Sequence, residues 1–248
     1  MSLILLGLFS VVVGLIIGAS GVGGVLLIPL LVYFGDLTIH QAMATALFSF
    51  FFTGVIATVT YQRYGSIDWK IAIPVCVGSM LTSYVGAHVN AFVDAKVLYI
   101  ILGLIIISSS AYSMRQPKGT SIAESLLPRG RLYTLFGIGL VVGFLCGLTG
   151  IGGGLVSLPI MLIVGFHPLA SIATGQVLQG IVATFGSISN IANGFVIFDI
   201  VWWVTALEVT GVFIGVKIAH MVPVAKLKRS VSLLCLSIGV YMLVKAWL

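Results

Sequence analysis

Charge is what this chain of 248 residues has least of: only 7% of its residues are Asp, Glu, Lys or Arg. Soluble domains carry about 25% charged residues, so this chain has too few to cover a water-facing surface. Hydrophobic residues make up 60% of the chain, and the mean hydropathy is +1.23. These values exclude a soluble globular protein and indicate an all-α integral membrane protein.

A bilayer core about 30 Å thick requires roughly 20 apolar residues per helix. Seven runs approach that length, and a shorter one precedes them. The predicted spans are 41–61, 71–90, 97–114, 132–148, 170–192, 200–219 and 231–248, after a short run at 3–17.

Cysteine is also rare, and signatures of metals or cofactors are missing. Cys76, Cys146 and Cys235 lie in apolar runs without the C-x-x-C spacing of redox or metal sites, so we expect packing roles and no metal. No phosphate-binding loop occurs, so any use of ATP would require another subunit. The net charge of +6 does not indicate nucleic acid, because the basic residues lie at the ends of predicted spans. We expect no cofactor and no nucleic-acid partner.

What the chain has in abundance is glycine, and its glycines form a repeated phrase. Residues 20–29 read S-G-V-G-G-V-L-L-I-P and residues 149–159 read T-G-I-G-G-G-L-V-S-L-P. The first glycines of the two phrases, Gly21 and Gly150, are 129 positions apart. Clustered glycines inside an apolar run predict a broken helix. Two breaks at equivalent places predict a transporter built by duplication.

One polar stretch, residues 115–131, separates the two halves. The expected organisation is a first transmembrane repeat over 1–114, this connector, and a second transmembrane repeat over 132–248. Each half is expected to hold a broken pair of short helices, either re-entrant or fully spanning, followed by three long transmembrane helices. The pieces of the pairs are 3–17 with 25–34 and 132–148 with 155–165.

Positive charge orients the two halves. If the connector is cytoplasmic, ten basic residues lie on the cytoplasmic side, and only Lys96 and Lys245 lie on the other. The positive-inside rule favours this arrangement, which requires the second repeat to be inverted relative to the first. We therefore expect a multi-pass protein of the bacterial inner membrane, with two breaks that enter from opposite faces and meet near the middle.

The breaks are suited to binding an anion. Helices that resume near Val25 and Leu155 direct their first amide groups and positive dipole ends toward the breaks, so an anion can bind without Lys or Arg. We expect substrate contacts from the glycine phrases, from matched hydroxyls and from two amides. These residues are Ser20, Gly21, Gly23, Gly24, Thr45, Thr149, Gly150, Gly152, Gly153, Gly154, Thr174, Gln176 and Gln179. The alternative is that the glycines only let helices pack closely.

Glu208 is the only acidic residue deep in a predicted span. A charge at the bilayer centre costs about 2.5–3.5 kcal/mol on insertion scales, so such residues are functional candidates. A proton-coupling role follows, with the carboxyl neutral on one side of the cycle and ionised on the other. The equivalent first-half residue is Ser79, so the repeat does not support that role. The alternative is a neutral side chain that packs against a neighbouring helix.

A membrane-embedded serine hydrolase is the rival class. The G-A-S-G of residues 18–21 has the form used by intramembrane serine proteases, but the second copy reads G-L-T-G and keeps only a hydroxyl. We therefore expect a transporter and not an enzyme. Within transport, a passive anion channel is the alternative to a carrier.

Four phrases resemble the TauE/SafE family of bacterial, archaeal and plant permeases. They are G-L-I-I-G-A-S-G-V-G-G-V-L-L-I-P-L-L (14–31), H-Q-A-M-A-T (40–45), G-L-T-G-I-G-G-G-L-V-S-L-P (147–159) and H-P-L-A-S-I-A-T (167–174). The resemblance implies a secondary carrier, typically an exporter driven by an ion gradient, for small sulfur-containing anions such as sulfite or sulfonates. Its site aligns with Ser20–Gly24 and Thr149–Gly154. The expected partners are this anion and the lipid bilayer, with a homodimer left open.

Overall fold

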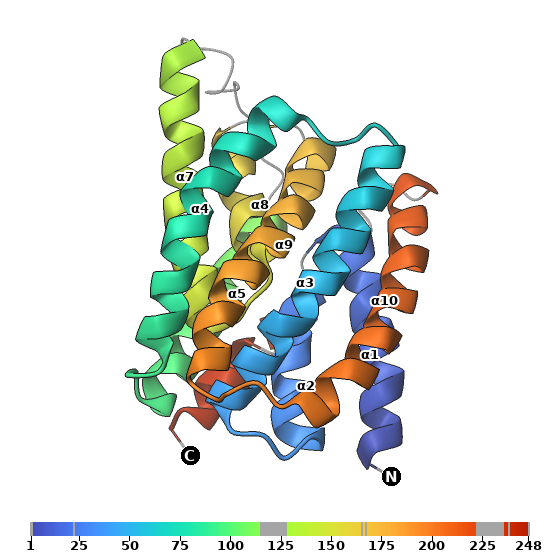
Figure 1. The fold of residues 1–248 in the computed structure, drawn as a ribbon, viewed down its shortest axis with the longest axis vertical. Helices are drawn as coiled ribbons and strands as arrows, with labels where there is room; N and C mark the ends of the chain where they lie inside the picture. The colour runs from blue at the N-terminus through green and yellow to red at the C-terminus, as the bar shows by residue number, and fades with distance from the viewer. Residues whose placement is uncertain are drawn as a thin grey trace.

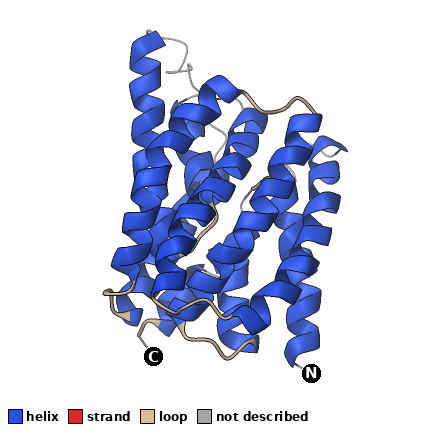
Figure 2. Ribbon diagram, in the orientation of Figure 1, coloured by secondary structure: helices blue, strands red, loops and turns tan. Residues whose placement is uncertain are grey.

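The computed structural model describes residues 2–21, 23–114, 128–164, 166, 168–221, 236–237 and 239–247. All regular structure in these residues is helical (Figure 2), which confirms the expected fold class. In chain order the elements are α1 (Ser2–Ser20), the short 3-10 helix η1 (Gly23–Leu26), α2 (Leu27–Phe34), α3 (Ile39–Arg63), α4 (Trp69–Asn90), α5 (Ala95–Met114), α7 (Pro128–Thr149), α8 (Gly153–Val164), α9 (Pro168–Ala192) and α10 (Phe198–Met221). Most of the predicted connector and much of the predicted span 231–248 lie outside the described residues.

Five of these helices, α3, α4, α7, α9 and α10, are long and apolar enough to cross a membrane. The outer faces of the bundle are apolar as well: Leu81 is 68% exposed and Leu104 is 54% exposed. Such faces are stable against lipid and costly against water. The chain is therefore a multi-pass membrane protein.

The helices around each glycine phrase extend further than the sequence indicates. We expected the first pieces over 3–17 and 132–148, but α1 continues to Ser20 and α7 covers 128–149. Helical structure resumes at Gly23 and Gly153, two residues before the expected Val25 and Leu155. A helical glycine costs about 1 kcal/mol relative to alanine. Backbone groups left unbonded in a membrane cost more, so the breaks stay short.

The two broken pairs start from opposite ends of the bundle (Figure 1). Helix α1 begins at the end of the molecule where α2 finishes, whereas α7 begins at the opposite end, where α8 leads into α9. The same reversal relates α3 to α9 and α4 to α10. The directions of α1, α3 and α4 are thus opposite to those of α7, α9 and α10.

Packing between the halves repeats as well. Helix α1 packs along α10, and its counterpart α7 packs along α4. A Cβ atom on Gly14 would overlap the backbone of Glu208, and one on Gly143 would overlap the backbone of Ser79. These two contacts are 129 positions apart on both helices. Away from the breaks, the glycines therefore let helix backbones approach closely.

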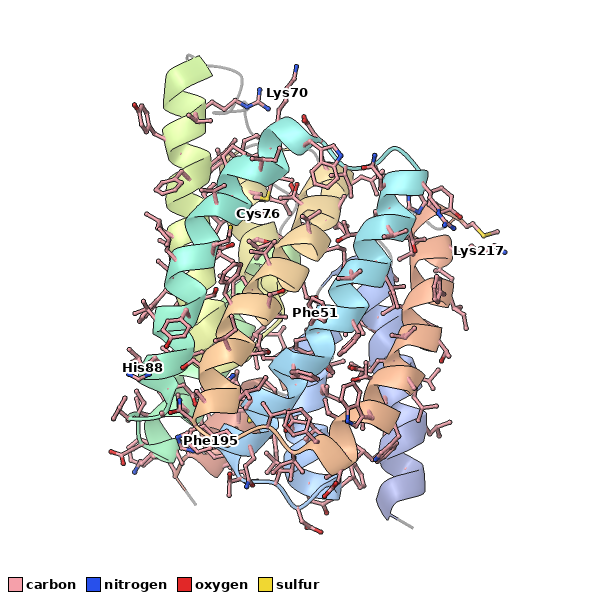
Figure 3. The ribbon with its side chains drawn as sticks, viewed as in Figure 1. Phe51, Lys70, Cys76, His88, Phe195 and Lys217 are labelled. Atoms are coloured by element: carbon pink, nitrogen blue, oxygen red, sulfur yellow. The ribbon has the colours of Figure 1, made fainter. Side chains whose placement is uncertain are left out.

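Basic residues gather at one end of the bundle. Figure 3 shows Lys70 and Lys217 at the same end, where α7 also begins. The two basic residues expected on the opposite face each contact an aromatic ring. Lys96 Nζ lies 4.4 Å from the ring centre of Trp247, and Lys245 Nζ lies 5.5 Å from that of Tyr99. These two contacts join the start of α5 to the C-terminal segment.

Candidate functional site

The two glycine breaks touch each other inside the bundle. A Cβ atom on Gly154 would overlap the carbonyl oxygen of Gly21. A Cβ atom on Gly21 would lie 3.5 Å from Gln176 Nε2 and 3.9 Å from the Cα atom of Gly154. The end of α1, the start of α8 and the side of α9 thus meet at one point, and a larger residue at either glycine would separate them.

Each break begins with a glycine in the left-handed region. Gly21 has φ +73° and Gly150 has φ +66°, although they lie in different halves of the chain. Glycine adopts this conformation without the steric penalty that a Cβ atom brings, and it commonly ends a helix. The Gly21 N–H donates to Ile17 O at 2.8 Å, which closes the last turn of α1. The repeated glycine phrase therefore ends both helices with the same left-handed backbone conformation.

Side chains from other helices complete the helix ends at the breaks. Gln176 Nε2 donates to Ile17 O at 2.7 Å, and Tyr61 Oη donates to Gly18 O at 2.9 Å. At the end of α7, Asn90 Nδ2 donates to Leu148 O at 2.6 Å. The last carbonyls of a helix have no partner within it, and burial makes an unpaired carbonyl costly. Tyr61 and Asn90 carry no sequence signal for this role, since they belong to distant segments outside the glycine phrases.

Both predicted amides of α9 lie at the breaks. Gln176 adjoins the first break, and its Oε1 atom is buried without a hydrogen-bond partner. Gln179 Nε2 donates to Thr53 Oγ1 at 3.0 Å. A Cβ atom on Gly152 would lie 2.7 Å from Gln179 Oε1, so this amide adjoins the second break. One helix thus supplies an amide to each break.

The predicted hydroxyls have different surroundings. Ser20 donates to Ile16 O at 2.9 Å and Thr149 donates to Leu145 O at 2.6 Å, each within its own helix. Thr174 is fully buried on α9, and its hydroxyl has no hydrogen-bond partner. The Thr45 hydroxyl accepts from the Ile197 N–H at 3.1 Å, in the connection between α9 and α10 rather than at a glycine break.

Ser157 is a residue of the site that the sequence reasoning missed. It lies one turn into α8, it is fully buried, and its Oγ atom has no hydrogen-bond partner among the described residues. A Cβ atom on Gly175 would lie 3.3 Å from Ser157 Oγ and 3.0 Å from the Cα atom of Gly154. Its first-half equivalent is Ile28, so a search for matched hydroxyls could not find it.

The remaining predicted glycines line the walls of the breaks. Gly24 packs on the ring of Phe50, and Gly150 packs on the backbone of Met43. Gly153 lies against the backbone of α9 at Gln179, and Gly23 begins η1. Helices α3 and α9 therefore flank both breaks.

Glu208 lies outside the breaks, on the face of α10 that packs against α1. Its side chain is fully buried, and neither carboxyl oxygen has a hydrogen-bond partner among the described residues. Ser49 of α3 lies close to the carboxyl, and its hydroxyl donates to Ala46 O at 2.9 Å. Among the described residues, no three His, Cys, Asp or Glu side chains are grouped to hold a metal ion.

Two broken helix pairs that start from opposite ends of a helical membrane protein and meet at buried glycines are typical of membrane transporters. The family model described as "Sulfite exporter TauE/SafE" matches residues 3–242, and the chain belongs to this family. The resemblance inferred from the glycine phrases is thereby confirmed.

Curated relatives carry transporter names. The chain is 31% identical over 240 residues to the "Probable membrane transporter protein YunE" of Bacillus subtilis (strain 168), covering 87% of this chain and 85% of the relative. It is 29% identical to the "Probable membrane transporter protein MJ0441" of Methanocaldococcus jannaschii, with 94% of each chain covered. It is 27% identical to YdhB of Bacillus subtilis, covering 93% of this chain and 95% of the relative. These names agree with a transporter rather than an enzyme. No solved structure matches the chain.

Proposed function

We propose that this protein is a secondary transporter that exports a small sulfur-containing anion, such as sulfite or a sulfonate, by alternating access. The family description names sulfite export. The observation that carries the proposal is the contact between the two breaks, where the Ser157 hydroxyl lies buried without a partner beside the first turn of α8. A buried hydroxyl without a partner is costly, and a bound anion would accept its hydrogen bond.

The chemistry of this point favours an anion. Helix α8 begins at Gly153, so its first N–H groups have no partner within the helix and carry the positive end of its dipole. Together with the Ser157 hydroxyl, they would hold the oxygen atoms of a small oxyanion. Neutral donors also suit a carrier, because they bind an anion without retaining it as strongly as a buried Lys or Arg would.

The opposed directions of the two halves support alternating access. A pair of repeats that run in opposite directions has two related states, one open to each face of the membrane. Excess basic charge at the end that holds Lys70 and Lys217 supports a cytoplasmic position for that end and for the connector. We therefore place the protein in the bacterial inner membrane as two inverted repeats.

Flux measurements in proteoliposomes test the proposed function. Vesicles are loaded with sulfite, sulfate, thiosulfate or a short sulfonate, and exchange is measured with the same anion outside. A carrier shows saturable exchange that is accelerated by anion on the far side. A passive channel shows flux without that acceleration, and flux no faster than in protein-free vesicles would overturn the proposal. A serine hydrolase predicts complete loss of activity in Ser20→Ala, whereas a carrier retains part of its exchange.

Cysteine labelling tests the orientation separately. Lys118→Cys and Lys96→Cys are made in a chain whose three native cysteines are replaced by alanine. We expect an impermeant thiol reagent to label the two positions from opposite faces of intact membranes. Labelling of both from the same face would contradict the inverted arrangement.

A further inference from the structure

In the described part of the chain, the helices packed around Glu208 offer it no cation. The described elements that pack most extensively against α10 are α1 and α3. The segment of α1, residues 2–20, contains no titratable side chain. On α3 and α10, the other titratable or charged side chains lie toward the helix ends; they are His40, Tyr61, Arg63, Asp199, Lys217 and His220. Of these, Tyr61 bonds Gly18 O, His40 bonds Val93 O and His220 bonds Ser66.

Burial without a cation favours the protonated form of the Glu208 carboxyl. A buried carboxylate without a charge partner is several kcal/mol less stable than the neutral acid. The packed arrangement therefore requires a proton on the carboxyl. Thr205, one turn earlier on α10, also has a buried hydroxyl without a partner. The surroundings of Glu208 thus stabilise the protonated carboxyl, and the proton can leave only when water reaches the side chain.

Helix α3 connects Glu208 with the anion site. Ser49 lies beside the carboxyl, and Thr53 lies one turn further along α3 on the same side of the helix. Thr53 Oγ1 accepts a hydrogen bond from Gln179 Nε2 at 3.0 Å. Gln179 Oε1 in turn adjoins Gly152 in the second break. Ser49 and Thr53 on one side of α3, with Gln179 beyond them, thus place polar side chains between the carboxyl and the glycines.

We propose that Glu208 is the site of a coupling proton and that Thr53 transmits its state to the anion site by positioning Gln179. This inference rests on the proposed function, since it assigns the driving ion of the same transporter. When Glu208 loses its proton, the carboxylate requires water, and α10 must separate from α3 near Ser49. Thr53 then moves with α3, and Gln179 loses its place beside Gly152. One proton bound or released at one carboxyl thereby changes the anion site.

Two assays in the same proteoliposomes separate this inference from the proposed function. Anion exchange at equal pH on both sides reports the anion site alone, whereas accumulation driven by an imposed pH gradient of either polarity reports coupling. In Glu208→Gln, a permanently neutral isostere, we expect exchange to persist and gradient-driven accumulation to fall by about tenfold or more. Glu208→Gln that still accumulates anion would overturn the proton site. Absence of exchange in the unmodified protein would instead overturn the proposed function.

Thr53→Val tests the transmission with nearly the same side-chain shape. We expect exchange to fall by less than about threefold, the worth of one net hydrogen bond, while gradient-driven accumulation falls by about tenfold. Thr53→Ser should restore accumulation. Thr60→Val is the matched control on α3, because the Thr60 hydroxyl donates to Ile56 O at 2.7 Å within its own helix. Full accumulation in Thr53→Val, or equal loss in both assays, would overturn the role of Thr53.

Discussion

The two glycine breaks share a backbone and differ in their walls. Gly21 and Gly150 have the same left-handed conformation, and Ser20 and Thr149 donate to the preceding turn in the same way. The walls come from α3 and α9, which are equivalent helices of the repeat. On α9 the wall residues are Gln176 and Gln179, whereas the positions 129 residues earlier on α3 are Leu47 and Phe50.

The two breaks therefore share a main-chain conformation but present different side chains to a ligand. Phe50 presents its ring to Gly24, while Gln179 presents an amide to Gly152. The main-chain conformation is the same at both breaks, where a Cβ atom would be strained. The flanking side chains diverged, so one wall is aromatic and the other can form hydrogen bonds. An anion held between them is expected to contact the second half through hydrogen bonds and the first half through apolar surface.

Gly154→Ala should have the largest effect, because the added Cβ atom would overlap the carbonyl oxygen of Gly21 and separate the two breaks. We expect anion exchange to fall by about a hundredfold, as overpacking by 1–3 kcal/mol acts where two backbones touch. Gly137→Ala on α7 is the control, since its Cβ atom would meet nothing within 4 Å. Equal exchange rates for the two variants, measured at matched protein content, would contradict the contact.

Gln176→Leu introduces the residue type of the equivalent Leu47 and makes the two walls more alike. The change leaves Ile17 O with only the Gly21 N–H as its donor and removes an amide from the site. The loss of one net hydrogen bond costs about 0.5–1.5 kcal/mol, so the KM for exchange should rise by up to about tenfold. The control is Gln62→Leu, whose exposed amide oxygen accepts from Trp69 Nε1 far along α3. An unchanged KM in Gln176→Leu would show that this amide does not contribute to substrate binding.

Tyr61→Phe should affect stability more than exchange, because Tyr61 completes the end of α1 without lining the contact of the breaks. Its loss leaves Gly18 O without its donor. We expect a loss of about 1–2 kcal/mol and a Tm lower by several degrees, measured by thermal unfolding in detergent. Tyr84→Phe is the control, since Tyr84 is an exposed residue that stacks on His88. The same Tm in both variants would argue against the cap.

Thr45→Val should have the smallest effect on transport. Its hydroxyl accepts from the Ile197 N–H, so we expect exchange within about twofold of the unmodified protein. Ser157→Ala, which removes a hydroxyl beside the breaks, should reduce exchange more. If Thr45→Val reduced exchange as much as Gln176→Leu, Thr45 would belong to the site.

The sequence predicted the elements and the breaks well, for physical reasons that act locally. Apolar runs near bilayer length determine which segments are helical, so α3 and α4 appear close to 41–61 and 71–90. The left-handed glycines require the absence of a Cβ atom, so Gly21 and Gly150 mark both breaks. Gln176 and Gln179 were predicted as amide donors one turn apart in the second half, although they have no polar counterparts in the first.

Residues that act across the fold could not be found in that way. Tyr61, Asn90 and Thr53 are ordinary polar residues in long apolar helices, and their roles depend on which carbonyl or amide another helix brings to them. Ser157 lacks a counterpart in the repeat, and Thr45 has a counterpart but a different neighbour. A hydrogen bond between residues more than 100 positions apart, such as Gln179 with Thr53, leaves no pattern in a single sequence.

By itself, the sequence determined the membrane environment, the repeated glycine phrase, the two helix breaks and the family, because each depends on local composition or on glycine. The tertiary structure alone decided that the breaks touch, that α9 serves both of them, and that Glu208 faces Ser49 rather than a cation. Those outcomes depend on close packing of whole helices through glycines such as Gly14 and Gly143, which brings together residues that the chain keeps far apart.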